Sequence, residues 1–169
     1  MSEALRVLFL CTGNSARSQM AEAILRHAAK GAIEVGSAGT LPQPDIHPLA
    51  RRAVKKLLDL DMDGQYPKTL DRFLGQHFDY VITVCDRAAE SCPVSPGGPE
   101  RIHWSLEDPA AVIGTDEKKQ RAFDATATDL LSRIRLWLSL PALRSRLGGT
   151  TNSDAPGPVR QRAGKQTLG

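Results

Sequence analysis

The feature that most constrains this chain is a short apolar run that leads through a tight loop into a helical pattern. Residues 6–10 (RVLFL) are apolar and partly β-branched, which is typical of a buried strand. Residues 11–18 (CTGNSARS) have glycine and asparagine at their centre, and apolar residues at helical spacing follow over 17–30. A buried strand that leads into a helix begins a βαβ unit, whose strands pair in parallel.

The alternation of strands and helices continues along the chain. Together with 41% hydrophobic and 24% charged residues among 169, it predicts one α/β domain of three layers, a four-stranded parallel sheet flanked by helices. We place this domain at residues 1–147. Residues 148–169 are rich in small, turn-forming and basic residues with hardly any large apolar ones, so we expect a disordered tail. The further strands are predicted at 32–37, 79–84 and 101–104, and the further helices at 48–59 and 116–140.

Charge and hydropathy exclude two classes of partner. The net charge is only +3 and aromatic residues make up 5%, so we expect no nucleic-acid partner. The apolar run at 7–11 is far shorter than the roughly 20 residues of a membrane span. It also lacks the basic flank and cleavage site of a signal peptide. We therefore predict a cytoplasmic protein with no membrane contact, and we expect a monomer.

The loop after the first strand has the composition of an anion-binding cradle. Cys11 and Arg17 bracket five residues, and Ser18 follows. In an open α/β sheet, ligands bind at this edge, where backbone N–H groups and a helix N-terminus favour negative charge. Arg17 can hold two oxygens of a tetrahedral oxyanion at once. The predicted substrate-binding residues are Thr12, Gly13, Asn14, Ser15, Ala16, Arg17 and Ser18.

The same positive field acts on Cys11. A free thiol has a pKa of about 8.5, and helix N-termini or a nearby arginine can lower it by several units. We therefore predict that Cys11 is a thiolate nucleophile, with Ser18 donating a hydrogen bond to it. Asn14 is expected to shape the loop through a left-handed backbone conformation. A buried structural cysteine beside an unrelated arginine is the alternative interpretation.

Residues 11–23 (CTGNSARSQMAEA) resemble the phosphate-binding loop of the low-molecular-weight tyrosine phosphatase superfamily. The run Ser-Gln-Met-Ala-Glu within them is similar to that of the arsenate reductases of this superfamily. Residues 35–40 (VGSAGT) also resemble its second-strand segment. The resemblance covers residues 5–140 and leaves the tail out. It implies a phosphatase-like fold and an oxyanion substrate.

An acidic pair follows the fourth predicted strand, in the run HWSLEDP at 103–109. Oxygen that leaves an arsenic or phosphorus centre needs a proton, which a carboxylic acid on a loop facing the cradle can supply. The family resemblance implies that Asp108 is this general acid. Without the resemblance, a solvated acidic turn would be the favoured interpretation.

The chain has three cysteines, an odd number that does not favour a fixed disulfide framework. Cys85 ends the third predicted strand, and Cys92 follows seven residues later. If the residues between them are helical, their Cα atoms lie about 10 Å apart, whereas a disulfide needs less than about 7 Å. A bond between them would therefore require a local conformational change.

The resemblance to thioredoxin-coupled arsenate reductases implies a relay through all three thiols. Cys11 would attack arsenate with Asp108 as the acid, and Cys85 would displace arsenite from the adduct. Cys92 would then attack Cys85, and a thioredoxin-like protein would reduce the final disulfide. Arsenate reduction for arsenic detoxification, without a cofactor, is thus the predicted function.

Two other functions stay open at this point. A protein tyrosine phosphatase would need only Cys11, Arg17 and Asp108. Such enzymes usually carry aromatic residues at the pocket rim before the last helix, and the only tyrosines here are Tyr66 and Tyr80. A sensor of arsenite or oxidants would use the three thiols and would need neither the arginine nor the aspartate.

We predict no metal site. Three thiols at these spacings lack a convincing fourth zinc ligand, with His103 a distant candidate. Some relatives bind potassium near the loop through residues that correspond here to Asn14, Glu22, Ser37 and Lys68. An ammonium group at the last position would repel a cation and take its place against Glu22.

Overall fold

Four parallel strands form the centre of the computed structural model, which describes residues 4–91 and 98–147. The strands are β1 (Leu5–Cys11), β2 (Ile33–Gly39), β3 (Tyr80–Thr83) and β4 (Glu100–His103). They lie in the order β2-β1-β3-β4, so β1 is paired on both sides. The predicted α/β class and four-stranded parallel sheet are confirmed, with strand ends within two residues of the predicted ones.

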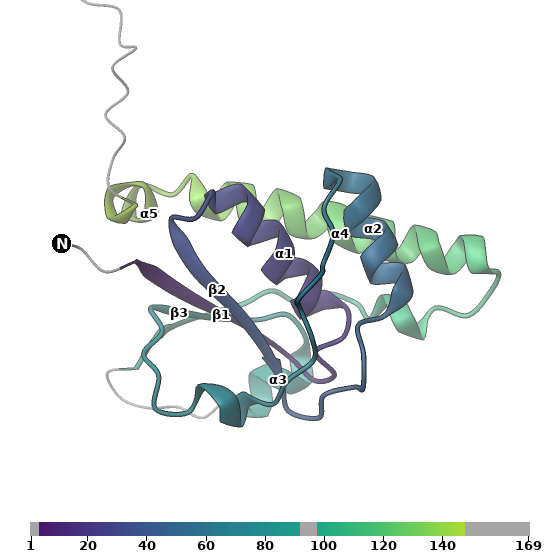
Figure 1. The fold of residues 1–169 in the computed structure, drawn as a ribbon, viewed down its shortest axis with the longest axis horizontal. Coiled ribbons are helices and arrows are strands. Elements are labelled where there is room, and N and C mark those ends of the chain that lie inside the picture. Colours follow the sequence, from purple (N-terminus) through teal and green to yellow (C-terminus); the bar gives the residue numbers. More distant parts are fainter. Residues whose placement is uncertain (1–3, 92–97, 148–169) are drawn as a thin grey trace, which may run out of the picture.

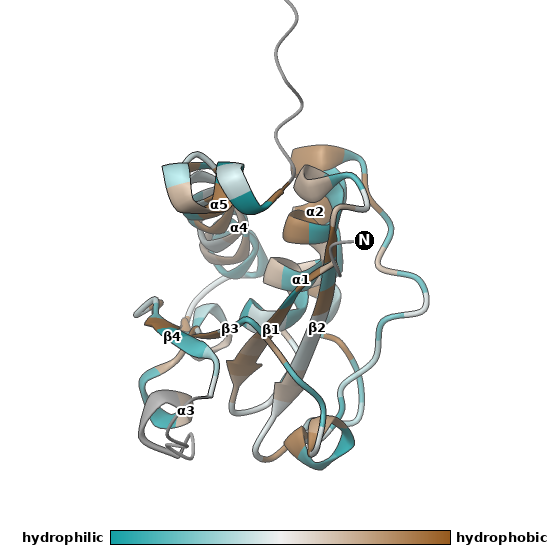
Figure 2. Cartoon of the chain, turned by 90° about the vertical axis from the view of Figure 1, so that its left-hand side faces the viewer, coloured by the Kyte–Doolittle hydropathy of each residue, from teal (hydrophilic) through white to brown (hydrophobic). Residues whose placement is uncertain are grey.

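Helices cover both faces of this sheet (Figures 1 and 2). One face carries α1 (Arg17–Ala29), α2 (Pro48–Leu58), α4 (Asp116–Leu138) and α5 (Pro141–Arg146). The short helix α3 (Asp86–Ser91) and the 3-10 helix η1 (Leu70–Phe73) lie on the other side. A second 3-10 helix, η2, spans Pro109–Ala111. The predicted last helix ran to residue 140, but α4 ends at Leu138 and Pro141 starts α5, because proline is well suited to a first helical position.

The long helix α4 supplies much of the core. Its predicted apolar stripe is confirmed, and the ring of Trp137 meets that of Tyr80 on β3 edge-on at 5.2 Å between centroids. This contact and the packing of α4 against α1 and α2 fix the helical layer on the sheet. The buried residues of the stripe are Phe123, Ala127, Leu130, Ile134 and Trp137.

Polar side chains determine where α4 begins. The hydroxyl of Thr115 accepts a hydrogen bond from the backbone N–H of Lys118 at 3.1 Å. Asp116 and Glu117 follow in the first turn, where carboxylates interact favourably with the helix dipole. Thr115 is therefore an N-cap that satisfies one of the four free N–H groups of the helix.

Replacement of Thr115 by alanine should lower the free energy of unfolding by about 1 kcal/mol, because the N-cap hydrogen bond is lost. Thr128→Ala is the matched control, since this exposed threonine lies inside α4 and its hydroxyl donates to the carbonyl of Asp124. Alanine favours helix interiors, so the control should not destabilise the protein. Urea denaturation measures both values, and equal losses in the two variants would contradict the capping role.

Two expectations fall outside what the structure describes. Cys92 and residues 148–169 are not among the described residues, so the domain boundary at 147 and the tail stay predictions. Among the helices of the described ranges, none is long and apolar enough to cross a bilayer.

Candidate active site

The parallel sheet brings two of the three cysteines together at the carboxyl ends of its central strands. Cys11 is the last residue of β1, and Cys85 follows β3 after Val84, whose N–H donates to the carbonyl of Leu10 at 2.9 Å. Both cysteines are buried, neither is in a disulfide, and both side chains line the same cleft. The two thiols are thus near enough for each to shift the pKa of the other.

A cleft of about 1050 Å³ opens over these thiols. Its lining includes the predicted loop from Cys11 to Arg17 together with Cys85 and Asp108. Ser18 does not line the cleft and is fully buried below the loop. Sequence reasoning missed a second wall of the cleft beside the loop, because its residues approach the loop only through the tertiary fold. That wall consists of Leu41, Gln43, Pro44, Asp45, Ile46, His47 and Pro48.

Asn14 gives the loop its shape. Its φ is 46°, the left-handed conformation predicted from the sequence, and its side chain is completely buried. The side-chain carbonyl accepts from Gln19 Nε2 and from the backbone N–H of Lys68, both at 3.0 Å. The amide nitrogen donates to Ser18 Oγ at 2.8 Å. The structure thus shows Ser18 as an acceptor for Asn14. The expected hydrogen bond from Ser18 to Cys11 stays a prediction.

Gly39 allows the loop to lie directly against β2. A Cβ atom at this position would stand 2.5 Å from the carbonyl oxygen of Thr12 and 2.9 Å from Cβ of Asn14. The clash involves backbone, so it could not be relieved by a side-chain rotation. The run VGSAGT therefore has a physical role as the surface on which the cradle rests.

Arg17 is oriented by the loop that carries Asp108. Its Nη1 donates to the carbonyl of Leu106 at 2.8 Å. Its Nε is buried and has no hydrogen-bond partner within the described ranges. Since buried donors are almost always paired in proteins, an anion in the cradle is the natural partner for this N–H.

Asp108 stands at the start of η2 and lines the same cleft. Its carboxylate accepts from the backbone N–H of Ala110 at 2.9 Å and is exposed to solvent. Pro109 is buried and fixes the backbone just after it. The carboxyl group is therefore held at the cleft while remaining free to exchange protons with water.

The protonation of the two thiols differs from what the sequence predicted. The hydrogen bond with Cys11 lowers the pKa of Cys85 to about 5, and Thr12 supports this with a hydroxyl contact at 3.4 Å. The same bond, followed by burial, raises the pKa of Cys11. These pKa directions oppose the expected thiolate at Cys11. The pair holds one negative charge, because two adjacent thiolates would repel each other, and the pKa directions favour Cys85 as its carrier.

This arrangement can be tested by thiolate absorbance at 240 nm in a Cys92→Ser variant, which retains only the two described cysteines. One thiolate should form with a midpoint near pH 5, far below an ordinary thiol. In the additional variant Cys85→Ser, that titration should disappear. Cys11 should then titrate lower than in the parent, because the largest cause that raises its pKa is gone. A parent protein without absorbance change between pH 4 and 7 would contradict the shared charge.

A polar cluster beside Cys85 was also missed by sequence reasoning. His103, considered above only as a distant zinc ligand, contacts Thr83 Oγ1 through Nδ1 at 2.7 Å and Asp86 Oδ1 through Nε2 at 2.9 Å. Ser105 Oγ donates to the same carboxylate oxygen at 3.1 Å. In the sequence, only the polar residues at 85–87 (CDR) and 103–105 (HWS) indicated this contact.

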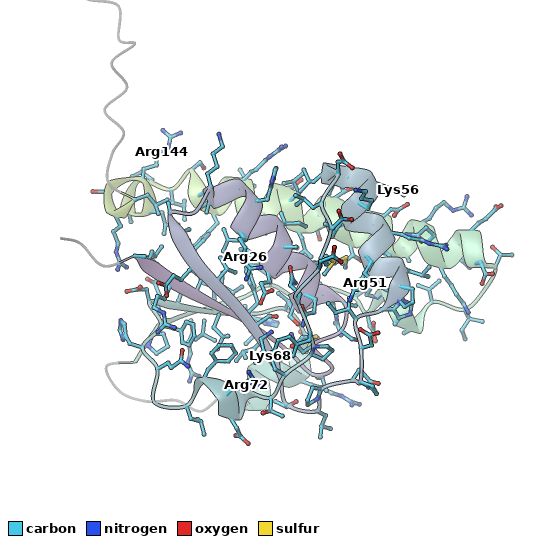
Figure 3. All side chains as sticks on the ribbon, in the orientation of Figure 1. Arg26, Arg51, Lys56, Lys68, Arg72 and Arg144 are labelled. Carbon is cyan, nitrogen blue, oxygen red and sulfur yellow. The ribbon has the colours of Figure 1, made fainter. Side chains whose placement is uncertain are left out.

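The predicted contact between Lys68 and Glu22 is present. Lys68 Nζ lies 3.7 Å from Glu22 Oε1, which also accepts from Ser37 Oγ at 3.2 Å. Burial lowers the pKa of Lys68 despite the favourable effect of Glu22. Arg26 adds a second, shorter contact to Glu22 at 3.4 Å, and Figure 3 shows Arg26 and Lys68 on the same side of the molecule. Two cations thus already neutralise the buried carboxylate.

The ammonium group should make activity insensitive to potassium. Exchange of sodium for potassium at constant ionic strength should leave the steady-state rate of the parent unchanged. In Lys68→Asp, an acidic group replaces the ammonium beside Glu22 and Ser37, so potassium should stimulate the reaction. Potassium stimulation of the parent protein would contradict the role of Lys68.

Over residues 6–145, the sequence matches the model of a family described as low molecular weight phosphotyrosine protein phosphatase. The chain belongs to this family. A relative named arsenate reductase, from Halalkalibacterium halodurans, is 40% identical over 129 residues, which cover 76% of this chain and 91% of the relative.

Solved structures agree with this family. A Corynebacterium glutamicum protein described as a thioredoxin-dependent arsenate reductase superposes with a TM-score of 0.58 at 32% identity, covering 80% of this chain and 64% of that one. A structure described as an arsenate reductase in the phosphate binding state gives a TM-score of 0.63 at 27% identity, covering 79% and 96%. The fold is therefore that of this family.

Proposed function

We propose that this chain reduces arsenate to arsenite and passes the electrons through Cys11, Cys85 and Cys92. The observation that carries the proposal is that the Cys11 and Cys85 thiols line one cleft together with Arg17 and Asp108. A phosphatase needs a nucleophile, an arginine and an acid, but it has no use for a second thiol in the same cleft. The similarity to proteins named arsenate reductases supports the same conclusion.

The first step joins arsenic to sulfur. Arsenate binds in the loop, with its oxygens held by backbone N–H groups and by the free Nε of Arg17. The Cys11 proton passes to the Cys85 thiolate through their hydrogen bond as Cys11 attacks. The Cys11 sulfur displaces one oxygen of arsenate, and that oxygen leaves as water after it receives a proton from Asp108. No electron has yet been transferred, because arsenic remains in its pentavalent state.

The second step reduces arsenic. The Cys85 sulfur, once deprotonated, attacks the Cys11 sulfur of the adduct and forms the Cys11–Cys85 disulfide. The sulfur–arsenic bond breaks and its electron pair stays on arsenic, which leaves as trivalent arsenite after protonation. The two thiols lose the two electrons that arsenic gains. Because both sulfurs already lie in one cleft, this attack requires little rearrangement.

The third cysteine closes the cycle. Cys92, which lies outside the described residues, attacks Cys85 and releases Cys11 as a thiolate for the next arsenate. The resulting Cys85–Cys92 disulfide takes two electrons from a dithiol protein of the thioredoxin class. The thioredoxin dependence of the Corynebacterium glutamicum relative supports this choice of reductant.

Oxidation of NADPH in the presence of arsenate, thioredoxin and thioredoxin reductase measures the complete cycle. The parent protein should turn over many times. Cys92→Ser should stop after about one arsenite per protein, because its Cys11–Cys85 disulfide no longer has a resolving thiol. Hydrolysis of an aryl phosphate serves as the control, since it needs Cys11, Arg17 and Asp108 alone and should be equal in both proteins.

Other outcomes would favour the competing functions. Absence of arsenate turnover with intact aryl phosphate hydrolysis would identify a phosphatase with two idle thiols. A single stoichiometric oxidation or arsenite binding in the parent, without turnover or phosphate hydrolysis, would identify a thiol sensor.

A further inference from the structure

Four polar side chains form a continuous hydrogen-bonded chain beside Cys85, and the relay does not use any of them. Thr83 ends β3, His103 ends β4, Asp86 is the first residue of α3, and Ser105 lies on the loop toward Asp108. The contacts measure 2.7 Å from Thr83 to His103, 2.9 Å from His103 to Asp86 and 3.1 Å from Ser105 to Asp86. They connect α3 to both the sheet and the acid loop.

The positions of the hydrogens along these hydrogen-bonded side chains follow from which groups can donate and which can accept. The Asp86 carboxylate can only accept, so His103 Nε2 carries a proton and donates it. His103 Nδ1 accepts from the Thr83 hydroxyl when the ring is neutral and donates to it when the ring is charged. Both protonation states therefore retain the contact to Asp86. The donors His103 and Ser105 accordingly lower the pKa of the Asp86 carboxyl.

The position of Asp86 matters because α3 separates the two cysteines of the last disulfide. Helix α3 covers Asp86–Ser91, and Cys85 and Cys92 flank it. Cys85 and Cys92 are seven positions apart, a separation that spans about 10 Å at the rise of an α-helix. A disulfide permits only roughly 7 Å between Cα atoms. The helix must therefore unwind before these two sulfurs bond. Asp86 directly follows Cys85, so its contacts resist movement at the end of the helix where the bond forms.

We propose that Asp86 is a positioning residue whose hydrogen bonds to His103 and Ser105 hold α3 in the helical, reduced state and oppose formation of the Cys85–Cys92 disulfide. This inference rests on the proposed relay. A latch of this kind keeps Cys85 beside Cys11 and Thr12 while arsenate is bound, and it makes the oxidised pair easier for a reductant to reduce. Its strength has to be modest, since a tight latch would block the relay.

The exposure of the cluster sets the size of the effect. The side chains of Asp86 and His103 are 75% and 38% exposed. Contacts between exposed charged groups change equilibria by a small factor, of about threefold here. For a two-electron couple, tenfold in the equilibrium constant is 29.6 mV, so threefold is about 14 mV. Loss of the contacts should make the reduction potential of the Cys85–Cys92 pair more negative by this amount.

A redox titration with reduced and oxidised glutathione measures this potential. Two electrons and two protons pass from the two thiols to oxidised glutathione as the disulfide forms. The full-length chain is used with Cys11→Ser, so that only the Cys85–Cys92 pair can close, and alkylation followed by mass spectrometry counts the disulfide. Asp86→Ala should shift the potential by about −14 mV. Asp86→Asn should restore the parent value, because its amide oxygen accepts the same two hydrogen bonds.

Two further variants separate the contacts from other effects. Asp45→Ala removes a carboxylate that lines the same cleft but pairs with Arg51, and it should leave the potential unchanged. His103→Ala should shift the potential with the same sign as Asp86→Ala, and the double variant should add little.

The outcomes are decisive in each case. A potential unchanged in Asp86→Ala, or an equal shift in Asp86→Asn or Asp45→Ala, would overturn the latch while leaving the relay intact. Failure of the parent pair to form any disulfide would overturn the relay and the latch together. Arsenate turnover by the protein with all three cysteines, measured as described above, distinguishes these two failures.

Discussion

The hydrogen bonds around the buried side chain of Asn14 are the interaction on which the site depends. A cradle that turns its N–H groups toward an anion must adopt a strained path, and here the strain falls on one left-handed residue. That conformation is held because Gln19 and the backbone of Lys68 satisfy the Asn14 carbonyl from below. Gln65 in turn donates to the Gln19 side chain at 2.8 Å, so the support extends to a segment some fifty residues away. Loss of Asn14 itself would leave the backbone N–H of Lys68 without this acceptor, and an unpaired buried polar group costs more than the hydrogen bond itself contributes.

The parallel sheet converts this local arrangement into a reaction site. Strands that run in one direction deliver the residues after β1, β3 and β4 to one edge, and this places the nucleophile, the second thiol and the acid loop around one cleft. Arg17 also joins two of these parts, because its bond to the Leu106 carbonyl ties the start of α1 to the loop of Asp108. The position of Asp108, the proposed acid, therefore depends on the same side chain that is proposed to bind the anion.

The sequence predicted the regular elements and the identity of the loop, because both depend on local patterns. Apolar spacing identified α4, and the glycine and asparagine of the loop indicated its conformation. The missing features depend on contacts between residues far apart in the chain. The protonation state of Cys11 could not be predicted, because the largest cause of its raised pKa is Cys85, a residue 74 positions later. The wall at 41–48 and the pairing of His103 with Asp86 were missed for the same reason, and α5 is too short for a periodic pattern to show.

The two kinds of helix in this structure suit their different tasks. Helix α4 has 23 residues and a buried face, so its stability comes from its own length and from packing against two other helices. Helix α3 has six residues, and an isolated helix of that length is unstable in water, because the cost of the first turn is never recovered. Its folded state therefore depends on tertiary contacts, of which buried Ala88 supplies an apolar one and Asp86 the polar ones. A helix this short can unwind without disturbing the sheet, which is the property that a relay between flanking cysteines requires.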